Sequence, residues 1–450
     1  HQSPASGLGV VEVRGGARPV VAAGLVLAVA GALRLIGLSN PPFRYGDEID
    51  YALDLQGRYA GPPQLLATIP KPPPGLPVIQ GDLSWVHPPL GKLLIAWGEQ
   101  LFGANPVGWR MSAAVFGILG VALVYAMALT LWRSSWWAAL PALLLAEDGL
   151  HIVHSRIAML DVFEVTFATA GMACLLVAWR AQAKPGRAAG WWEAAAGALL
   201  GAAIACKWSG MFLLLPGLVV CCVVAWRHGG ARWRAVGLTV CRLAVLPVAV
   251  YMATYSAFFV EHGVDAGGFA RLQLGMLRYQ TTYQLQGHPM ASAPISWPLI
   301  LRPFTFYYAP IGISPSGALL PDSREKEIED VGNPVLWWAW LGLAPLAAWG
   351  ALRRRRWDEA LALGGYLCCW LPWLFIGRTQ FFYYMLPATP FMALGACAGL
   401  RAFGGRLQRP LAIGFAAAST MAAVAFAPHW LGLAIPLGWS DGLRWLNGWT

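Results

Sequence analysis

Two adjacent carboxylates, Asp47 and Glu48, stand in the segment FRYGDEIDY shortly after a long apolar stretch ends. Neighbouring side chains point in different directions, so these acids suit two separate tasks better than one shared proton. A hydroxyl group that acts as a nucleophile needs a base within hydrogen-bond reach, because its own pKa lies far above neutral. We therefore take Asp47 as a candidate general base. The alternative is that both acids cap the start of an interfacial helix.

A second polar group surrounds a Pro-Pro turn in WVHPPLGK, where His87 and Lys92 flank the two prolines. A rigid turn of this kind holds two polar groups at the depth of lipid head groups, which predicts a phosphate-binding or substrate-positioning element. The alternative is a simple helix entry with proline in its first turn. Arg110 follows near the start of the next apolar run, where a permanent cation can pair with a lipid phosphate or act as an interface anchor.

The densest group of ionisable residues lies between two apolar stretches at 147–164: Glu147, Asp148, His151, His154, Arg156, Asp161 and Glu164. Ionisable residues beside hydrocarbon are costly and indicate a functional site. Asp148, His151 and His154 share a helical face and could form a metal triad. An ion-paired turn with Arg156 explains the same residues more simply, so we predict no metal site. Arg156 and Asp161 remain candidate substrate-binding residues.

Two further cations interrupt apolar stretches beside aromatic residues: Lys207 in CKWSGMF and Arg378 in RTQFFYYMLP. A cation at the membrane edge can stabilise the negative charge that develops on a departing phosphate. We therefore add Lys207 and Arg378 to the candidate phosphate-binding residues.

The composition shows which elements must position these residues. Of the 450 residues, 57% are hydrophobic and only 12% are charged, against about 25% charged in soluble domains. This composition predicts a polytopic membrane protein. The net charge of +10 comes from short basic clusters between apolar runs rather than from one basic face, so we read these clusters as topology signals and expect no nucleic-acid partner.

The apolar windows predict an all-α fold with about eleven transmembrane helices, since about 20 apolar residues cross a bilayer. The first window lacks the small-residue pattern of a cleaved signal peptide, so we expect it to be retained. The expected spans are 19–38, 107–131, 135–150, 158–179, 189–206, 209–226, 236–259, 335–352, 359–377, 382–400 and 408–427.

Basic residues in the linkers predict a cytoplasmic N-terminus and an extracytoplasmic C-terminus. With this orientation the cytoplasmic segments hold half of the 32 basic residues and only four of the 22 acidic ones, Glu12, Glu193, Asp358 and Glu359. The basic residues are Arg14, Arg18, Arg133, Arg180, Lys184, Arg187, Arg227, Arg232, Arg234, Arg353, Arg354, Arg355, Arg356, Arg401, Arg406 and Arg409. Two long loops, 39–106 and 260–334, then face outward, and 89–103 has the apolar spacing of an interfacial helix. We expect one domain over 1–427 and an extracytoplasmic segment over 428–450.

Six segments, in order, resemble the dolichyl- or polyprenyl-phosphate-mannose protein mannosyltransferases, a family with the GT-C glycosyltransferase fold. The matching segments are FRYGDEIDY, HPPLGKLLIA, WRMSAAVFG, HSRIAMLD, CKWSGMF and RTQFFYYMLPATPF. The resemblance implies transfer of mannose, with inversion, from a polyprenyl-phosphate carrier to Ser or Thr hydroxyls of proteins at the outer membrane face. It places the catalytic acidic pair on Asp47 and Glu48, with Glu48 orienting the acceptor or the sugar. It places the essential arginine on Arg110.

One departure from the family concerns the loop at 260–334, which has no room for the β-trefoil MIR domain of eukaryotic members. The chain therefore looks like a bacterial member, and acceptor selection stays unexplained. The sequence requires no cofactor and leaves open whether a divalent ion assists or a secretion channel supplies the acceptor.

Two rival functions remain. One is a GT-C transferase acting on a lipid or a cell-wall glycan, which would use the same carrier chemistry and carboxylate. The other is a lipid transporter or scramblase, which predicts charges deep inside the spans, whereas here the ionisable residues crowd one boundary.

Overall fold

The computed structural model describes residues 18–52, 71–79, 84–181, 188–228, 232–285, 287–313, 319–353 and 356–449. The remaining parts of the two long outer loops lie outside these ranges. Also outside the described residues are six charged residues expected on the cytoplasmic side: Glu12, Arg14, Lys184, Arg187, Arg354 and Arg355.

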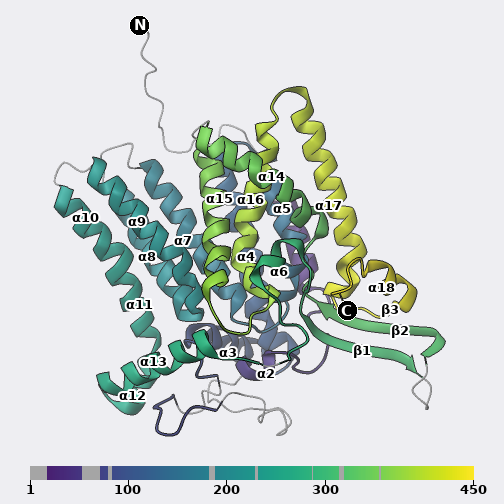
Figure 1. The fold of residues 1–450 in the computed structure, drawn as a ribbon, viewed down its shortest axis with the longest axis horizontal. Coiled ribbons are helices and arrows are strands. Elements are labelled where there is room, and N and C mark those ends of the chain that lie inside the picture. The colour runs from purple at the N-terminus through teal and green to yellow at the C-terminus, as the bar shows by residue number, and fades with distance from the viewer. Residues whose placement is uncertain are drawn as a thin grey trace.

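Long apolar helices run side by side through the molecule (Figure 1). Within the described ranges, seven stretches are long and apolar enough to cross a bilayer. They are formed by α4 (Pro106–Trp132), α7 (Asp161–Ala181), α8 (Ala188–Cys206), η2 (Trp208–Gly210) with α9 (Met211–His228), α10 (Arg232–Val240) with η3 (Cys241–Val245) and α11 (Leu246–Thr254), α14 (Pro334–Arg353), and η7 (Gly405–Leu407) with α17 (Gln408–Trp430). Two shorter apolar helices accompany them, α1 (Arg18–Leu35) and α5 (Ser135–Ala146).

The spans expected at 359–377 and 382–400 are each interrupted. The 14-residue helix α15 (Trp357–Trp370) continues into the 3₁₀ helix η5 (Leu371–Phe375), and η6 (Phe382–Ala388) precedes the 14-residue helix α16 (Thr389–Ala402). Proline near each junction removes a backbone donor and breaks the regular helix. The polytopic helical architecture is confirmed, but the exact count of eleven is not.

The span expected at 236–259 ends early. Helix α11 stops at Thr254, and two shorter helices follow, α12 (Ser256–His262) and α13 (Ala266–Thr282). They gather with α2 (Glu48–Tyr51) and α3 (Leu90–Phe102) at one end of the bundle (Figure 1). Helix α3 confirms that the apolar spacing at 89–103 forms a helix.

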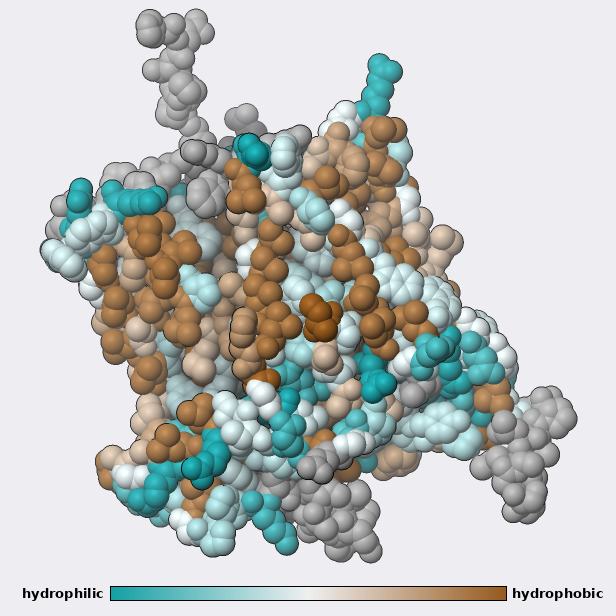
Figure 2. All heavy atoms as spheres, viewed as in Figure 1, coloured by the Kyte–Doolittle hydropathy of each residue, from teal (hydrophilic) through white to brown (hydrophobic). Residues whose placement is uncertain are grey.

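The surface and interior of the bundle match a membrane setting. Apolar side chains form a belt over the long helices, with polar groups above and below it (Figure 2). Inside, the stretch of α16 from Thr389 to Leu400 is buried throughout and packs against α5, α14 and α15. Helices from both halves of the chain therefore share one core.

A small antiparallel sheet in the segment 260–334, expected as the second outer loop, was not predicted. Strand β1 (Thr305–Ile313) pairs with β2 (Leu319–Glu329), Thr305 opposite Glu329, and β2 pairs with the short β3 (Ile435–Pro436). The pattern was hidden because alternate inward positions of β2 carry Glu325, Glu327 and Glu329, all buried. Their polarity removes the apolar alternation by which a half-buried strand is recognised.

The last turn of α17 and the segment after it contact this sheet. Arg444 Nη2 donates to Glu325 Oε1 at 2.7 Å, and His429 Nδ1 lies 3.3 Å from Glu327 Oε2. His429 Nε2 is 3.1 Å from Ser440 Oγ in α18 (Leu437–Leu443). These contacts attach the C-terminal segment, expected as a separate piece from 428, to the β-hairpin.

Candidate active site

The backbone before Asp47 makes a sharp turn at Gly46. Gly46 has φ of 53°, and a Cβ atom there would lie 2.9 Å from the Phe306 ring. Glycine meets both constraints because it has no side chain. Asp47 then occupies the N-cap of α2, but its side chain bonds to no backbone amide of that helix. Its carboxylate is therefore available for another partner.

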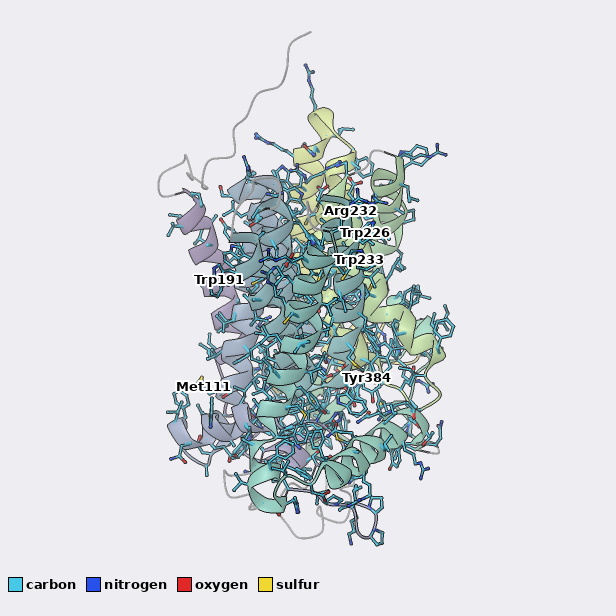
Figure 3. The ribbon with its side chains drawn as sticks, turned by 90° about the vertical axis from the view of Figure 1, so that its left-hand side faces the viewer. Met111, Trp191, Trp226, Arg232, Trp233 and Tyr384 are labelled. Carbon is cyan, nitrogen blue, oxygen red and sulfur yellow. The ribbon has the colours of Figure 1, made fainter. Side chains whose placement is uncertain are left out.

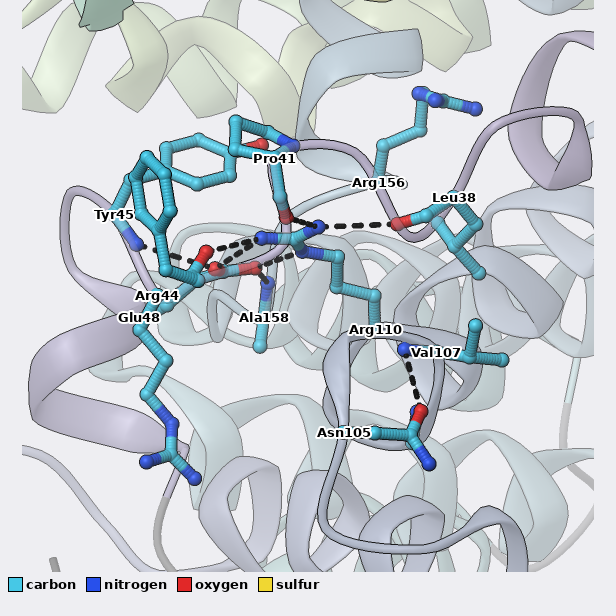
Figure 4. A network of polar contacts seen from close by, with 12 residues as sticks. Leu38, Pro41, Arg44, Tyr45, Glu48, Asn105, Val107, Arg110, Arg156 and Ala158 are labelled. Atoms are coloured by element: carbon cyan, nitrogen blue, oxygen red, sulfur yellow. Dashed lines mark hydrogen bonds and ion pairs between the residues drawn. The ribbon is translucent and has the colours of Figure 1, made fainter. Parts of the chain in front are cut away.

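Glu48 turns the other way and is fully buried against Arg110 (Figure 4). Arg110 Nε donates to Glu48 Oε1 at 2.7 Å and Nη2 donates to Oε2 at 2.8 Å. The backbone N–H groups of Tyr45 and Ala158 donate to the same carboxylate at 3.3 and 3.0 Å. Bidentate pairing of this kind fixes orientation as well as charge.

The remaining donors of Arg110 bind the loop backbone. Nη1 donates to the carbonyls of Leu38 and Pro41, and Nη2 donates to that of Phe43, at 2.8–3.1 Å. All five N–H groups of the guanidinium are thereby engaged. Arg110 and Glu48 hold the loop that carries Asp47, and the guanidinium has no donor left for a phosphate.

Two other predicted site residues also bind backbone carbonyls. Arg156 donates to the carbonyls of Leu33, Arg34, Ile36 and Gly37 at 2.9–3.1 Å. These bonds satisfy backbone carbonyls at the C-terminal end of α1. Lys92 Nζ donates to the carbonyls of Ser84 and His87, each at 3.0 Å, and so closes the Pro-Pro turn. Both cations shape the segments around the site.

Lys207 and Asp161 form a buried ion pair, with Nζ and Oδ1 2.7 Å apart. Asp161 is the first residue of α7, and Lys207 lies between α8 and η2. The ammonium also lies 4.7 Å from the ring centroid of Tyr384. Burial alone would lower the pKa of Lys207, but Asp161, Tyr384 and Glu164 raise it above its ordinary value. Lys207 is therefore a cation at neutral pH.

Arg378 approaches the same place from the segment between η5 and η6. Its Nη1 donates to Gln280 Oε1, and its Nε donates to the Thr379 carbonyl at 3.2 Å. The guanidinium carbon lies 5.7 and 5.8 Å from the ring centroids of Tyr384 and Tyr279. Arg378 also borders a cavity of about 510 Å³ between the segments at 284–294 and 373–380.

His87 completes the group. Its ring meets Tyr51 edge to face at 6.0 Å, and its Nδ1 lies 3.5 Å from Gln280 Nε2. Burial, with the nearby cations Lys207, Arg378 and Lys92, lowers its pKa well below the ordinary value. The imidazole is therefore neutral at physiological pH and offers one N–H donor.

The charges of this group act on the pKa of Asp47. Burial and Asp161 raise its pKa to about 6, while Lys207, His154 and Arg378 act in the opposite direction. Its carboxylate is mostly ionised at neutral pH and retains enough basicity to accept a proton. Of the nine predicted site residues, the structure thus brings five together here: Asp47, His87, Asp161, Lys207 and Arg378.

The alternative metal triad does not form. Asp148 accepts from the backbone N–H of His151 at the start of α6 (Gly149–His154), His151 Nδ1 lies 2.8 Å from Arg34 Nη2, and His154 Nε2 lies 3.5 Å from Asp330 Oδ2. Within the described ranges, no three His, Cys, Asp or Glu side chains are placed to hold a metal ion.

Sequence reasoning missed two residues at this site. Asp330 Oδ2 lies 3.5 Å from His154 Nε2, and Gln280 contacts both Arg378 and the His87 turn. Neither sits in a recognisable local pattern. Only the folding of the segment 260–334 against the bundle brings them to the site.

At one end of this helical bundle, a carboxylate with a raised pKa lies near cations. This arrangement in a membrane protein suits transfer of a group from an anionic carrier. Solved structures share this fold. The S. cerevisiae protein O-mannosyltransferase Pmt1-Pmt2 complex bound to the sugar donor matches with a TM-score of 0.76 at 14% identity, over 96% of this chain and 93% of that chain. ArnT from Cupriavidus metallidurans bound to undecaprenyl phosphate matches with a TM-score of 0.58 at 20% identity, over 92% and 70%. The fold is that of the GT-C membrane glycosyltransferases.

Sequence comparison identifies the family. Residues 97–261 match the dolichyl-phosphate-mannose-protein mannosyltransferase family, and residues 266–449 match the C-terminal four-helix membrane region of protein O-mannosyltransferases. The polyprenol-phosphate-mannose–protein mannosyltransferase of Mycolicibacterium smegmatis is 34% identical over 69% of each chain. That of Corynebacterium glutamicum is 28% identical over 81% of each chain. The chain belongs to the protein O-mannosyltransferase family and is a glycosyltransferase.

A more distant relative transfers a different sugar. An undecaprenyl phosphate-alpha-4-amino-4-deoxy-L-arabinose arabinosyl transferase of Pseudomonas paraeruginosa is 30% identical over 53% of this chain and 42% of its own length. Because the mannosyltransferases match over a larger share of their length, they are the better guide to substrate.

Proposed function

We propose that this protein transfers mannose from polyprenyl-phosphate-mannose to Ser or Thr hydroxyls of proteins, with inversion at the anomeric carbon. The observation that carries the proposal is the convergence of Asp47 with the Lys207–Asp161 pair and Arg378 at one end of the bundle. The names of the M. smegmatis and C. glutamicum relatives indicate the same donor and acceptor classes.

The chemistry follows from the charges. The acceptor hydroxyl oxygen attacks the anomeric carbon while its proton passes to an Asp47 carboxylate oxygen. The bond between that carbon and the phosphate oxygen breaks, and its electron pair stays on the phosphate. Lys207 and Arg378 stabilise the negative charge that develops there, and the neutral His87 supplies a hydrogen-bond donor. Attack opposite the leaving group inverts the configuration.

The other site residues act through these groups. Asp161 holds the Lys207 ammonium in place at 2.7 Å. Glu48, with its carboxylate occupied by Arg110, positions the Asp47 loop instead of contacting acceptor or sugar. Arg110, Lys92 and Arg156 support the surrounding backbone. We therefore propose Lys207 and Arg378 as the carrier-phosphate ligands and make Arg110 a positioning residue.

We further propose that the site end of the bundle is extracytoplasmic and that the N-terminus is cytoplasmic. Figure 3 shows Arg232, Trp226 and Trp233 toward one end of the bundle and Tyr384, which lies over Lys207, toward the other. Arg353, one of the arginines expected inside, lies in the last turn of α14, as expected from the bias of basic residues toward cytoplasmic loops.

Cysteine labelling tests this orientation. A membrane-impermeant maleimide applied to intact cells should label a Phe43→Cys variant and leave a Leu352→Cys variant unlabelled, both positions being exposed. The opposite pattern would place the site in the cytosol and remove the proposed reaction.

The reaction itself is tested with purified protein, polyprenyl-phosphate-mannose and a Ser/Thr-rich peptide. Asp47→Asn should abolish transfer without loss of fold, whereas Asp441→Asn, at an exposed position, should retain it. Equal turnover by wild type and Asp47→Asn would remove Asp47 from the mechanism. Transfer to a lipid or glycan acceptor but to no peptide would overturn the acceptor class. Repeating the assay with a chelator tests the need for a divalent ion, and co-purification tests association with a secretion channel.

A further inference from the structure

The side-chain amide of Gln280 joins three segments that are far apart in the sequence. Gln280 lies in the last turn of α13. Its Oε1 accepts a hydrogen bond from Arg378 Nη1, and its Nε2 donates to the Val86 carbonyl at 2.8 Å. The same Nε2 lies 3.5 Å from His87 Nδ1. One amide thus connects the second outer loop, the Pro-Pro turn and the segment that carries Arg378.

The partners of this amide determine which way it points. The Arg378 guanidinium has only donors, so the amide oxygen must face it, and the Val86 carbonyl only accepts, so the NH₂ group must face that side. An NH₂ group beside His87 Nδ1 favours the tautomer in which Nδ1 is unprotonated. The single N–H of the neutral His87 ring is then on Nε2.

The same contact restricts Arg378. Its Nη1 donates to Gln280, its Nε donates to the Thr379 carbonyl, and its guanidinium carbon lies 5.8 and 5.7 Å from the ring centroids of Tyr279 and Tyr384. Among the described residues, no protein acceptor contacts Nη2. The guanidinium is therefore held in one plane with one edge free for a ligand, which is the arrangement that recognises a phosphate oxygen.

We propose that Gln280 is a positioning residue for the carrier phosphate: it orients the Arg378 guanidinium through its oxygen and the His87 ring through its NH₂ group. This inference rests on the proposed function, because it takes the phosphate of polyprenyl-phosphate-mannose as the ligand of Arg378. Gln280 touches neither the sugar nor the phosphate and acts only through these two side chains.

The two halves of the amide can be separated by substitution. Gln280→Met keeps the length of the side chain and removes both polar contacts. Gln280→Glu keeps an oxygen for Arg378 and removes the donor to Val86 and His87. We expect the Met variant to raise KM for polyprenyl-phosphate-mannose about tenfold, the size expected when a charge-assisted hydrogen bond no longer holds a binding group. We expect the Glu variant to restore that KM to within about threefold of wild type and to show its deficit in kcat.

The experiment uses the full chain in detergent micelles, with donor KM, kcat and binding of mannose-free polyprenyl phosphate measured for each variant. Gln408→Met is the matched control, because among the described residues Gln408 donates to the Arg401 carbonyl near η7, in a part of the chain that the proposed site does not use. If the role of Gln280 were purely structural, its Met and Glu variants would be equally poor, and that result would overturn the inference. A Gln408→Met variant that is as harmful as Gln280→Met would overturn it too. A Met variant with wild-type KM would also overturn it.

The binding measurement separates this failure from failure of the proposed function. If the wild-type chain neither binds polyprenyl phosphate nor transfers mannose, the proposed function fails and this inference fails with it. If the wild type binds the carrier and transfers mannose while Gln280→Met binds the carrier equally well, only the role of Gln280 is refuted.

Discussion

Substitution of Glu48 by glutamine tests the buried pair that holds the Asp47 loop. The Glu48 carboxylate accepts four hydrogen bonds, two on each oxygen: Arg110 Nε and Ala158 N on Oε1, Arg110 Nη2 and Tyr45 N on Oε2. A glutamine has the same shape but only one acceptor oxygen. Whichever way its amide points, an NH₂ group faces two donors, one of them a buried guanidinium.

The expected cost is large. Removing one partner of a buried ion pair destabilises a protein by about 3–5 kcal/mol, because the other charge stays buried and uncompensated. We expect Glu48→Gln to lower the unfolding midpoint in detergent and to slow mannose transfer, since Asp47 is the adjacent residue. Glu261→Gln, at a half-exposed ion pair with His262, should cost only about 0–1 kcal/mol.

A double-mutant cycle makes the prediction specific. Glu48→Gln with Arg110→Gln removes both charges and should lose less stability than the two single changes added together. Thermal unfolding of the four proteins, with hydrogen exchange of the 38–48 backbone, provides the measurement. Additive losses, or a Glu48→Gln variant as stable as Glu261→Gln, would refute the assignment of Glu48 to loop positioning.

Three further predictions follow from the site and the sheet. Burial and Asp161 raise the pKa of Asp47 to about 6, so kcat/KM should fall as the pH drops through about 6 and the base becomes protonated; a flat profile across that range would contradict its role. Lys207→Met removes a cation that lowers this pKa, so the acid limb should move to higher pH and donor KM should rise, as steady-state kinetics can show. Arg444→Gln leaves Glu325 without its charged partner at 2.7 Å, so hydrogen exchange of the hairpin at 305–329 should accelerate while donor KM stays unchanged.

The sequence predicted the helices well because hydrocarbon imposes a strict rule on each segment. A crossing helix must be apolar over its length, whatever its neighbours are, and α4 and α14 begin and end within a few residues of the expected bounds. Where proline breaks the pattern, as at η6, composition alone still predicts an apolar span and overestimates its regularity.

The site was predictable by residue type but not by arrangement. Asp47, Lys207 and Arg378 were singled out because each is a charge at the edge of an apolar stretch. The sequence could not show that Glu48 pairs with Arg110, 62 positions away, or that Gln280 reaches Arg378, 98 positions away. Contacts at that separation depend on how the helices pack, and no local pattern records them.

The way in which Arg110 and Arg156 hold the loop has a consequence for tolerance to mutation. Between them they bind seven backbone carbonyls from Leu33 to Phe43. Every amino acid presents a carbonyl, so the exposed side chains along this stretch, those of Leu35, Ile36 and Phe43, can be exchanged while the path of the chain is kept. Arg34, which is fully buried, and Gly37, with φ of 64°, are the exceptions. A saturation scan should therefore find permissive positions there, controlled by two intolerant arginines encoded much further along the gene.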